Sequence, residues 1–182
     1  MTSTTLPSRR VTRESLMTLE AYARARPEFR RQVIEHKKPR SIPLGDHVRL
    51  LFEDELTIRY QIQEMLRAEK TFEDAGIEHE LDAYNPLIPD AGNLKATLLI
   101  EFPDPAERAR ELARLRGIEH HVALDIEGAG RVLARADEDL DRSNDDKTSA
   151  VHFLRFPLDE AQRAALARAA AATLAVTDAR YG

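Results

Sequence analysis

Residues 94–102 carry the clearest secondary-structure signal of the chain. Apolar side chains occupy every second position from Leu94 to Phe102, and polar side chains occupy three of the four positions between them. A period of two places one set of side chains on one face of an extended strand. The fold must therefore contain a sheet that buries one face.

The remaining segments predict helices and strands in an order that does not alternate regularly. Further strands are expected over 47–54, 118–126, 131–136 and 150–156. Helices are expected over 55–75, 77–84, 105–116 and 158–172. Glycines 128 and 130 predict a hairpin between two of the strands. This mixture predicts an α+β fold with a mostly antiparallel sheet of about five or six strands packed by helices.

The N-terminal region is expected to form a helical pair. Thr12 can cap a first helix, and Pro27 can open a second helix that ends in the basic His36 and Lys37. The residues before this pair are rich in Ser, Thr and Arg. With 182 residues, the chain is close to the ~150 of a typical domain. We therefore expect a flexible tail over 1–11 and a single domain over 12–182.

The chain has no cysteine, which excludes disulfides, thiolate catalysis and iron–sulfur ligation by its own residues. Any metal would be held by His, Asp or Glu. The start Ser8-Arg9-Arg10 lacks the apolar region of an export signal, and the chain contains no apolar run of the ~20 residues that span a membrane. We expect a cytoplasmic protein.

Charge is distributed unevenly. Residues 1–40 hold 10 Lys and Arg against 4 Asp and Glu, whereas the rest hold 17 against 28, so +6 and -11 give the net -5. Lys37, Lys38 and Arg40 at the end of the basic region could bind an anion, nucleic acid or an acidic partner. No aromatic-interleaved strand or zinc finger accompanies them, which argues against nucleic acid.

The helix expected over 55–75 places a carboxylate on its apolar stripe. At 100° per residue, Glu69 projects from the middle of the stripe, so it is expected to face the core, paired or bound to a metal. The opposite face could contact a ligand or partner, or could simply be exposed to water. That face carries Tyr60, Gln63, Glu64 and Arg67.

Two histidines are expected inside the sheet. His120 shares a face with apolar residues of the strand over 118–126, and His152 does so in the strand over 150–156. If these strands are close together, Glu69, His120 and His152 could form a two-histidine, one-carboxylate site for iron, manganese or zinc. The alternative is that each histidine is a hydrogen-bonded packing residue.

Familiar catalytic motifs fail on inspection. No Glu-x-x-His or His-Glu-x-x-His occurs. The acidic run Asp137 to Asp146 lacks the glycine and the glutamate of a calcium loop, and it is expected to be a solvated turn. The sequence therefore favours a protein without a reaction of its own.

Six segments, in the same order, are similar to DUF3501, a bacterial family of unknown function. The segments are Thr18–Tyr22, Tyr60–Arg67, Glu80–Pro89, Asn93–Thr97, Leu115–His120 and Asp146–Arg155. The resemblance implies a small cytoplasmic protein that works beside rubrerythrin and an iron–sulfur oxidoreductase, in peroxide defence or electron transfer. It implies no catalytic residues.

Three functions are therefore open. The first is a non-enzymatic accessory or adaptor of a redox system, because a chain without cysteine leaves the sulfur ligands to its partners. The second is a metal-binding enzyme or sensor that uses Glu69, His120 and His152. The third is an anion or nucleic-acid binder that uses the basic N-terminal region.

Overall fold

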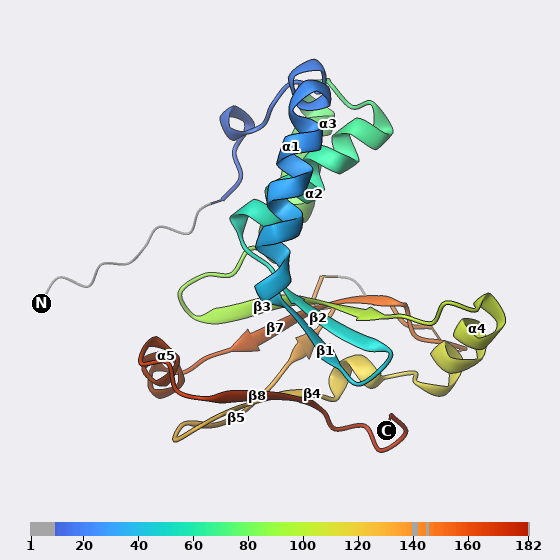
Figure 1. The fold of residues 1–182 in the computed structure, drawn as a ribbon, viewed down its shortest axis with the longest axis vertical. Helices are drawn as coiled ribbons and strands as arrows, with labels where there is room; N and C mark the ends of the chain where they lie inside the picture. The colour runs from blue at the N-terminus through green and yellow to red at the C-terminus, as the bar shows by residue number, and fades with distance from the viewer. Residues whose placement is uncertain (1–9, 140–141, 145, 182) are drawn as a thin grey trace, which may run out of the picture. The chain divides into compact units, whose positions relative to one another are not determined.

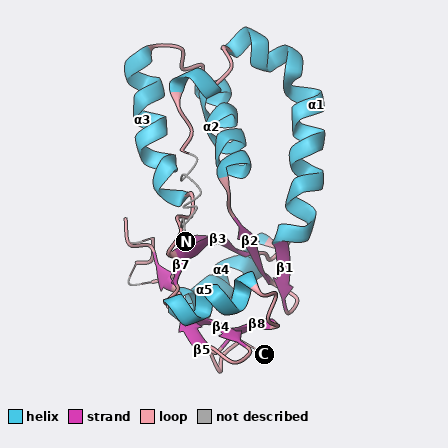
Figure 2. Cartoon of the chain, turned by 90° about the vertical axis from the view of Figure 1, so that its left-hand side faces the viewer, coloured by secondary structure: helices cyan, strands magenta, loops and turns pink. Residues whose placement is uncertain are grey.

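The computed structural model of the chain describes residues 10–139, 142–144 and 146–181. The chain divides into two compact units, which we call the helical unit and the sheet unit. The helical unit comprises Met1–Arg40 and Glu53–Ala91, and the sheet unit comprises Ser41–Phe52 and Gly92–Gly182. All strands of the described residues belong to the sheet unit, as the colours of Figure 2 show.

Three α-helices form the helical unit (Figure 1). They are α1 (Leu19–Lys37), α2 (Glu55–Glu69) and α3 (Asp74–Tyr84), with short 3-10 helices η1 (Arg13–Ser15), η2 (Lys38–Arg40) and η3 (Asn85–Leu87). The Asp54 carboxylate caps α2 by accepting from Thr57 N at 3.0 Å. Helices α1 and α2 contact each other and form an N-terminal helical pair, whereas the second helix expected from Pro27 is part of α1.

The boundaries of α1 differ from those that the sequence predicted. The Thr18 hydroxyl accepts from Ala21 N and caps α1, so the helix begins at Leu19 and not after Thr12. The helix then passes through Pro27 without a break, so the boundary expected there is wrong. The carbonyl of Ala23, which loses its bond to the proline, belongs to an exposed residue, where water can bond to it.

The sheet unit contains two antiparallel sheets. One has the order β1-β2-β3-β7-β6 and the other β5-β4-β8. The strands are β1 (Ser41–Leu44), β2 (Val48–Phe52), β3 (Asn93–Ile100), β4 (Val122–Ile126), β5 (Gly130–Leu133), β6 (Arg135–Ala136), β7 (Val151–Pro157) and β8 (Ala172–Val176). The helices are α4 (Pro105–Arg114), α5 (Glu160–Ala167) and η4 (Ile118–His120). The α+β class and the antiparallel sheet are confirmed.

One apolar core holds the sheet unit together. The alternating residues of β3 supply Leu98, which is fully buried, and Phe156 of β7 is buried with it. Leu115 and Ile118, on either side of Gly117, are also fully buried. Burying a large apolar side chain contributes roughly 1.5–3 kcal/mol, so the core fixes the position of the turn at Gly117.

Gly117 changes the structure of the segment that follows it. Its φ of 89° lies in the left-handed region, and residues 118–120 form η4 before β4 begins at Val122. The strand expected from residue 118 therefore starts four residues late. Among the described residues, no helix is both long enough and apolar enough to cross a membrane.

Candidate functional site

Three buried ionisable residues meet inside the sheet unit, and we call them the His152 cluster. Glu119 lies in η4, Asp137 follows β6, and His152 lies in β7. His152 is 0% exposed and Glu119 is 2% exposed, while the Asp137 side chain is 6% exposed. One ligand atom from each lies within 4.8 Å of the others, so the arrangement can hold either a proton or a cation.

Both ring nitrogens of His152 face hydrogen-bond acceptors. Nδ1 lies 2.5 Å from Asp137 Oδ2, and Nε2 lies 3.0 Å from the carbonyl oxygen of Ser149 and 2.7 Å from Thr148 Oγ1. A carboxylate and a carbonyl oxygen accept and do not donate. Each ring nitrogen of His152 therefore faces an oxygen that can only accept a hydrogen bond.

Glu119 is the second residue of the cluster. Its oxygens accept from Ser143 Oγ at 2.5 Å and from Thr148 Oγ1 at 3.0 Å, and one lies 3.7 Å from His152 Nε2. Burial acts to raise the pKa of Glu119, but these hydrogen bonds and the charge of His152 outweigh it and hold the pKa below its ordinary value. Glu119 is therefore a carboxylate at neutral pH.

Asp137 joins the cluster to the backbone of the sheet. Its Oδ1 accepts from Phe153 N at 3.0 Å and from Arg142 at 3.1 Å. The carboxyl groups of Glu119 and Asp137 thus face the His152 ring and the Arg142 guanidinium. Buried ionisable groups are tolerated when they are paired and hydrogen-bonded, and each member of this set has such a partner.

The geometry also allows a metal ion in place of one proton. His152 Nε2 and a Glu119 oxygen, 3.7 Å apart, could both bind one ion at about 2 Å. Asp137 would then remain on Nδ1 as the outer carboxylate that orients the ring. The ion would have to displace the Nε2 proton, so binding would compete with acid.

Nucleophilic catalysis does not fit the same residues. Thr148, His152 and Asp137 have the order of a hydroxyl, a base and an orienting carboxylate. However, Thr148 is 1% exposed, and its hydroxyl donates to Glu119. A substrate has no access to that oxygen.

The structure places only one of the three expected metal ligands in the cluster. His152 is buried, as expected. Glu69 is exposed at the end of α2 and His120 is exposed in η4, so the expectation that both are buried is wrong. His120 Nε2 approaches Glu119 from the exterior, at 3.9 Å. A metal role for Glu69 and His120 stays a prediction without the burial that motivated it.

Sequence reasoning missed Glu119 and Asp137. It placed Glu119 on the water side of a strand, because it continued the strand through η4. It also placed Asp137 in a solvated turn, although the side chain is 6% exposed. Asp141 and Asp145 of the same run lie outside the described residues. A usable signal was the buried His152, which needs an acid partner from somewhere in the chain.

The basic residues expected to bind anions already have partners. Lys38 Nζ lies 2.6 Å from Glu35, and Arg40 lies 2.8 Å from Asp54. The Lys37 ammonium lies 5.3 Å from the centre of the Tyr60 ring. Anion binding by these residues stays a prediction, and it would have to compete with these contacts.

The face of α2 expected to be free is largely covered inside the helical unit. Gln63 is 1% exposed, and Glu64 accepts from Tyr22 Oη at 2.6 Å and from Arg26 Nε at 2.7 Å. The Arg26 hydrogen bond lowers the pKa of Glu64 to about 2. Of the residues expected on this face, Arg67 is exposed.

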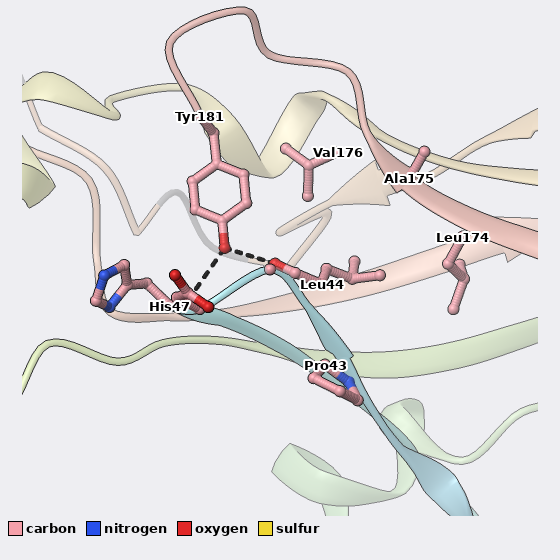
Figure 3. Close-up of a pocket in the computed structure, with 9 residues that line it drawn as sticks. Pro43, Leu44, His47, Leu174, Ala175, Val176 and Tyr181 are labelled. Atoms are coloured by element: carbon pink, nitrogen blue, oxygen red, sulfur yellow. Dashed lines mark hydrogen bonds between the residues drawn. The ribbon is translucent and has the colours of Figure 1, made fainter.

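The sheet unit also has a pocket of about 620 Å³, shown in Figure 3. The turn between β1 and β2 forms one wall, and Leu174 to Val176 of β8 form another. The Tyr181 hydroxyl donates to Leu44 O at 2.5 Å and accepts from Val48 N at 3.0 Å. Tyr181 therefore joins the two sides of the turn, and its hydroxyl both donates and accepts a hydrogen bond there.

The fold and the cluster define a two-unit α+β protein with a buried ionisable site in its antiparallel sheet unit. The chain matches the family of proteins of unknown function DUF3501 over residues 10–182, and it belongs to that family. It is similar to a protein of unknown function from Burkholderia pseudomallei, with 53% identity and a TM-score of 0.91 over 95% of this chain and 90% of that one. A search of curated proteins returns no match.

Proposed function

We propose that this chain is an accessory protein without a reaction of its own, which binds an iron–sulfur oxidoreductase and a rubrerythrin in a redox or peroxide-defence system. The closure of the His152 cluster carries the proposal. Its acid, base and hydroxyl groups are buried and bonded to one another, so they are not available to a substrate. The chain has no cysteine, and the sulfur ligands would come from its partners.

The partners are those that the family resemblance implies, and direct binding tests them. The purified chain is mixed with each purified partner, and complexes are followed by size-exclusion chromatography and calorimetry. We expect a Kd in the micromolar range or tighter with at least one of them. No complex with either partner at about 50 micromolar would overturn the proposal.

A pair of charge reversals tests whether the expected partner surface is used. Arg67→Glu changes an exposed residue of α2, and Arg110→Glu changes an exposed residue of α4. We expect only Arg67→Glu to weaken the complex. Equal affinities of the two variants for the partner would show that the partner does not contact this part of α2.

A second function is favoured by the ligand set of the cluster. We propose that Glu119 and His152 can bind one divalent cation, with Asp137 orienting the imidazole. Buried carboxylate and imidazole groups within 4.8 Å of each other support it, because iron, manganese and zinc all accept this mixture of ligands.

Metal analysis of untagged protein tests this second function. After supplementation with iron, manganese and zinc, we expect about one equivalent of one metal in the wild type. His152→Gln and Glu119→Gln should lose it, and the control Glu69→Gln should keep it. Absence of stoichiometric metal from the wild type would exclude this site as a metal centre.

A further inference from the structure

The first described residues pack against α2 and α3 of the helical unit, and we call the site that they occupy the groove. We call residues 10–18 the strap; apart from η1 it is not helical. Val11 is 2% exposed and Leu16 is 8% exposed. Both pack in one apolar cluster with residues of α2 and α3: Ile58, Ile62, Leu66, Ile77 and Leu81. The strap therefore inserts two aliphatic anchors between the two helices.

Two amide side chains form hydrogen bonds with the backbone of the strap. Asn85 Oδ1 accepts from Val11 N at 2.8 Å, and Asn85 Nδ2 donates to Val11 O at 2.9 Å. Gln63 Oε1 accepts from Met17 N at 2.7 Å, and Gln63 Nε2 donates to Met17 O at 3.4 Å. Each amide thus reproduces the donor and acceptor pair of a neighbouring strand. Such pairing recognises an extended backbone and not the side chain attached to it.

The helical unit contacts few of the side chains of the strap. Thr12, Glu14 and Ser15 are exposed. Arg13 Nε lies 3.7 Å from Asp74 Oδ1 at the start of α3, and Glu78, one turn further along α3, is exposed. The groove therefore selects an aliphatic residue, a basic residue two positions later and a second aliphatic residue three positions after that.

We propose that the groove between α2 and α3 is a receptor for a peptide of this chemistry, extended at its two ends and turned in the middle as the strap is at η1, and that the strap is its replaceable occupant within the same chain. A partner segment with the same two anchors would displace the strap and take over its four backbone hydrogen bonds. The proposal concerns the helical unit and does not depend on the metal or the redox partners proposed above.

The test uses the full chain with the strap released. Val11→Asp together with Leu16→Asp places charges on both anchors, and these leave an apolar groove. The probe is a fluorescein-labelled synthetic peptide of residues 10–18. We expect micromolar binding to the variant by fluorescence anisotropy, and at least about tenfold weaker binding to the wild type, whose groove is occupied.

Two controls locate the binding. A peptide that carries both aspartates should not bind, and adding Gln63→Ala to the released variant should weaken the wild-type peptide. If the released variant keeps its helical circular dichroism and does not bind the peptide at about 100 micromolar, the proposal is wrong. Equal binding by the wild type and the variant would also overturn it.

Amide hydrogen exchange in the wild type tests the proposal without any substitution. A replaceable strap must open while α2 and α3 stay folded, so the amides of Val11 and Met17 should exchange at least about tenfold faster than those of Ile62 and Leu66. Exchange of all four amides at one rate would show that the strap leaves only when the unit unfolds, and would overturn the proposal.

Discussion

The strap of the helical unit and the described part of residues 137–150 in the sheet unit are both irregular segments held by polar side chains. Neutral amides hold the strap, through Gln63 and Asn85. Charged groups hold the other segment, through Glu119, Asp137 and His152. The two attachments therefore differ in the chemistry of their side chains, although the polar groups of both must find hydrogen-bond partners.

The difference determines which conditions each attachment can sense. An amide has no proton to lose or gain near neutral pH, so the strap can be released only by opening or by competition. The His152 cluster consists of carboxyl and imidazole groups, the kinds of group that acid, base or a cation can change. One segment is suited to exchange and the other to chemical control.

Removal of His152 should have the largest effect. His152→Ala leaves Glu119 and Asp137 buried without their shared partner, and removal of one partner from a buried pair costs about 3–5 kcal/mol. Native-state amide exchange at β7 measures the loss in the sheet unit. His121→Ala, at an exposed position, is the control and should change it by less than about 0.5 kcal/mol.

Removal of one amide should have a smaller effect. Gln63→Ala leaves the N–H and C=O of Met17 without their partner, and an unsatisfied buried group costs about 1–3 kcal/mol. Amide exchange at α2 measures it. The difference from the wild type should be the same at pH 5 and pH 8; a pH-dependent difference would contradict the distinction between the two attachments.

Acid should weaken the attachment that depends on Glu119 and should not weaken the amide contacts of the strap. The folded pKa of Glu119 lies below its ordinary value, so the unfolded chain binds more protons and the stability from Glu119 is lost as pH falls below the unfolded value of about 4.3. The advantage of the wild type over Glu119→Gln, measured by urea unfolding at several pH values, should shrink through this window. Other acidic groups are present in both proteins and cancel.

Substitution of the exposed residues that the sequence favoured should have the smallest effect. Glu69→Gln and His120→Gln change side chains outside both attachments, and each should alter the free energy of unfolding by less than about 0.5 kcal/mol. Thermal unfolding followed by circular dichroism is sufficient. A loss above about 2 kcal/mol for His120→Gln would mean that the His152 cluster extends to it.

The fold was largely predictable because its signals are local. The alternation from Leu94 to Phe102 predicted β3, and the end of the strand expected over 47–54 placed the start of α2 at residue 55. The end of α2 was missed because Lys70 adopts the left-handed conformation, with φ of 54°, without a glycine to indicate it. The helix expected to continue to residue 75 includes Phe72, which is 70% exposed, and the expectation that Glu69 faces the core is wrong for the same reason.

The site was less predictable because its contacts join distant residues. His152 and Asp137 are 15 positions apart, and Thr148 and Glu119 are 29 apart. A pattern of local periods cannot show such pairs. The helical turn at residues 118–120, which replaces the start of the expected strand, was enough to reverse the expected positions of Glu119 and His120.

The Tyr181 hydroxyl joins Leu44 and Val48 across the turn of the first hairpin, yet it lies 137 positions beyond Leu44 in the chain. A ribosome that makes the chain in order delivers both strands of this hairpin long before the tyrosine. The residues of the helical unit are complete once Ala91 has emerged. The helical unit can therefore fold during translation before the sheet unit, which needs residues as far along the chain as Tyr181.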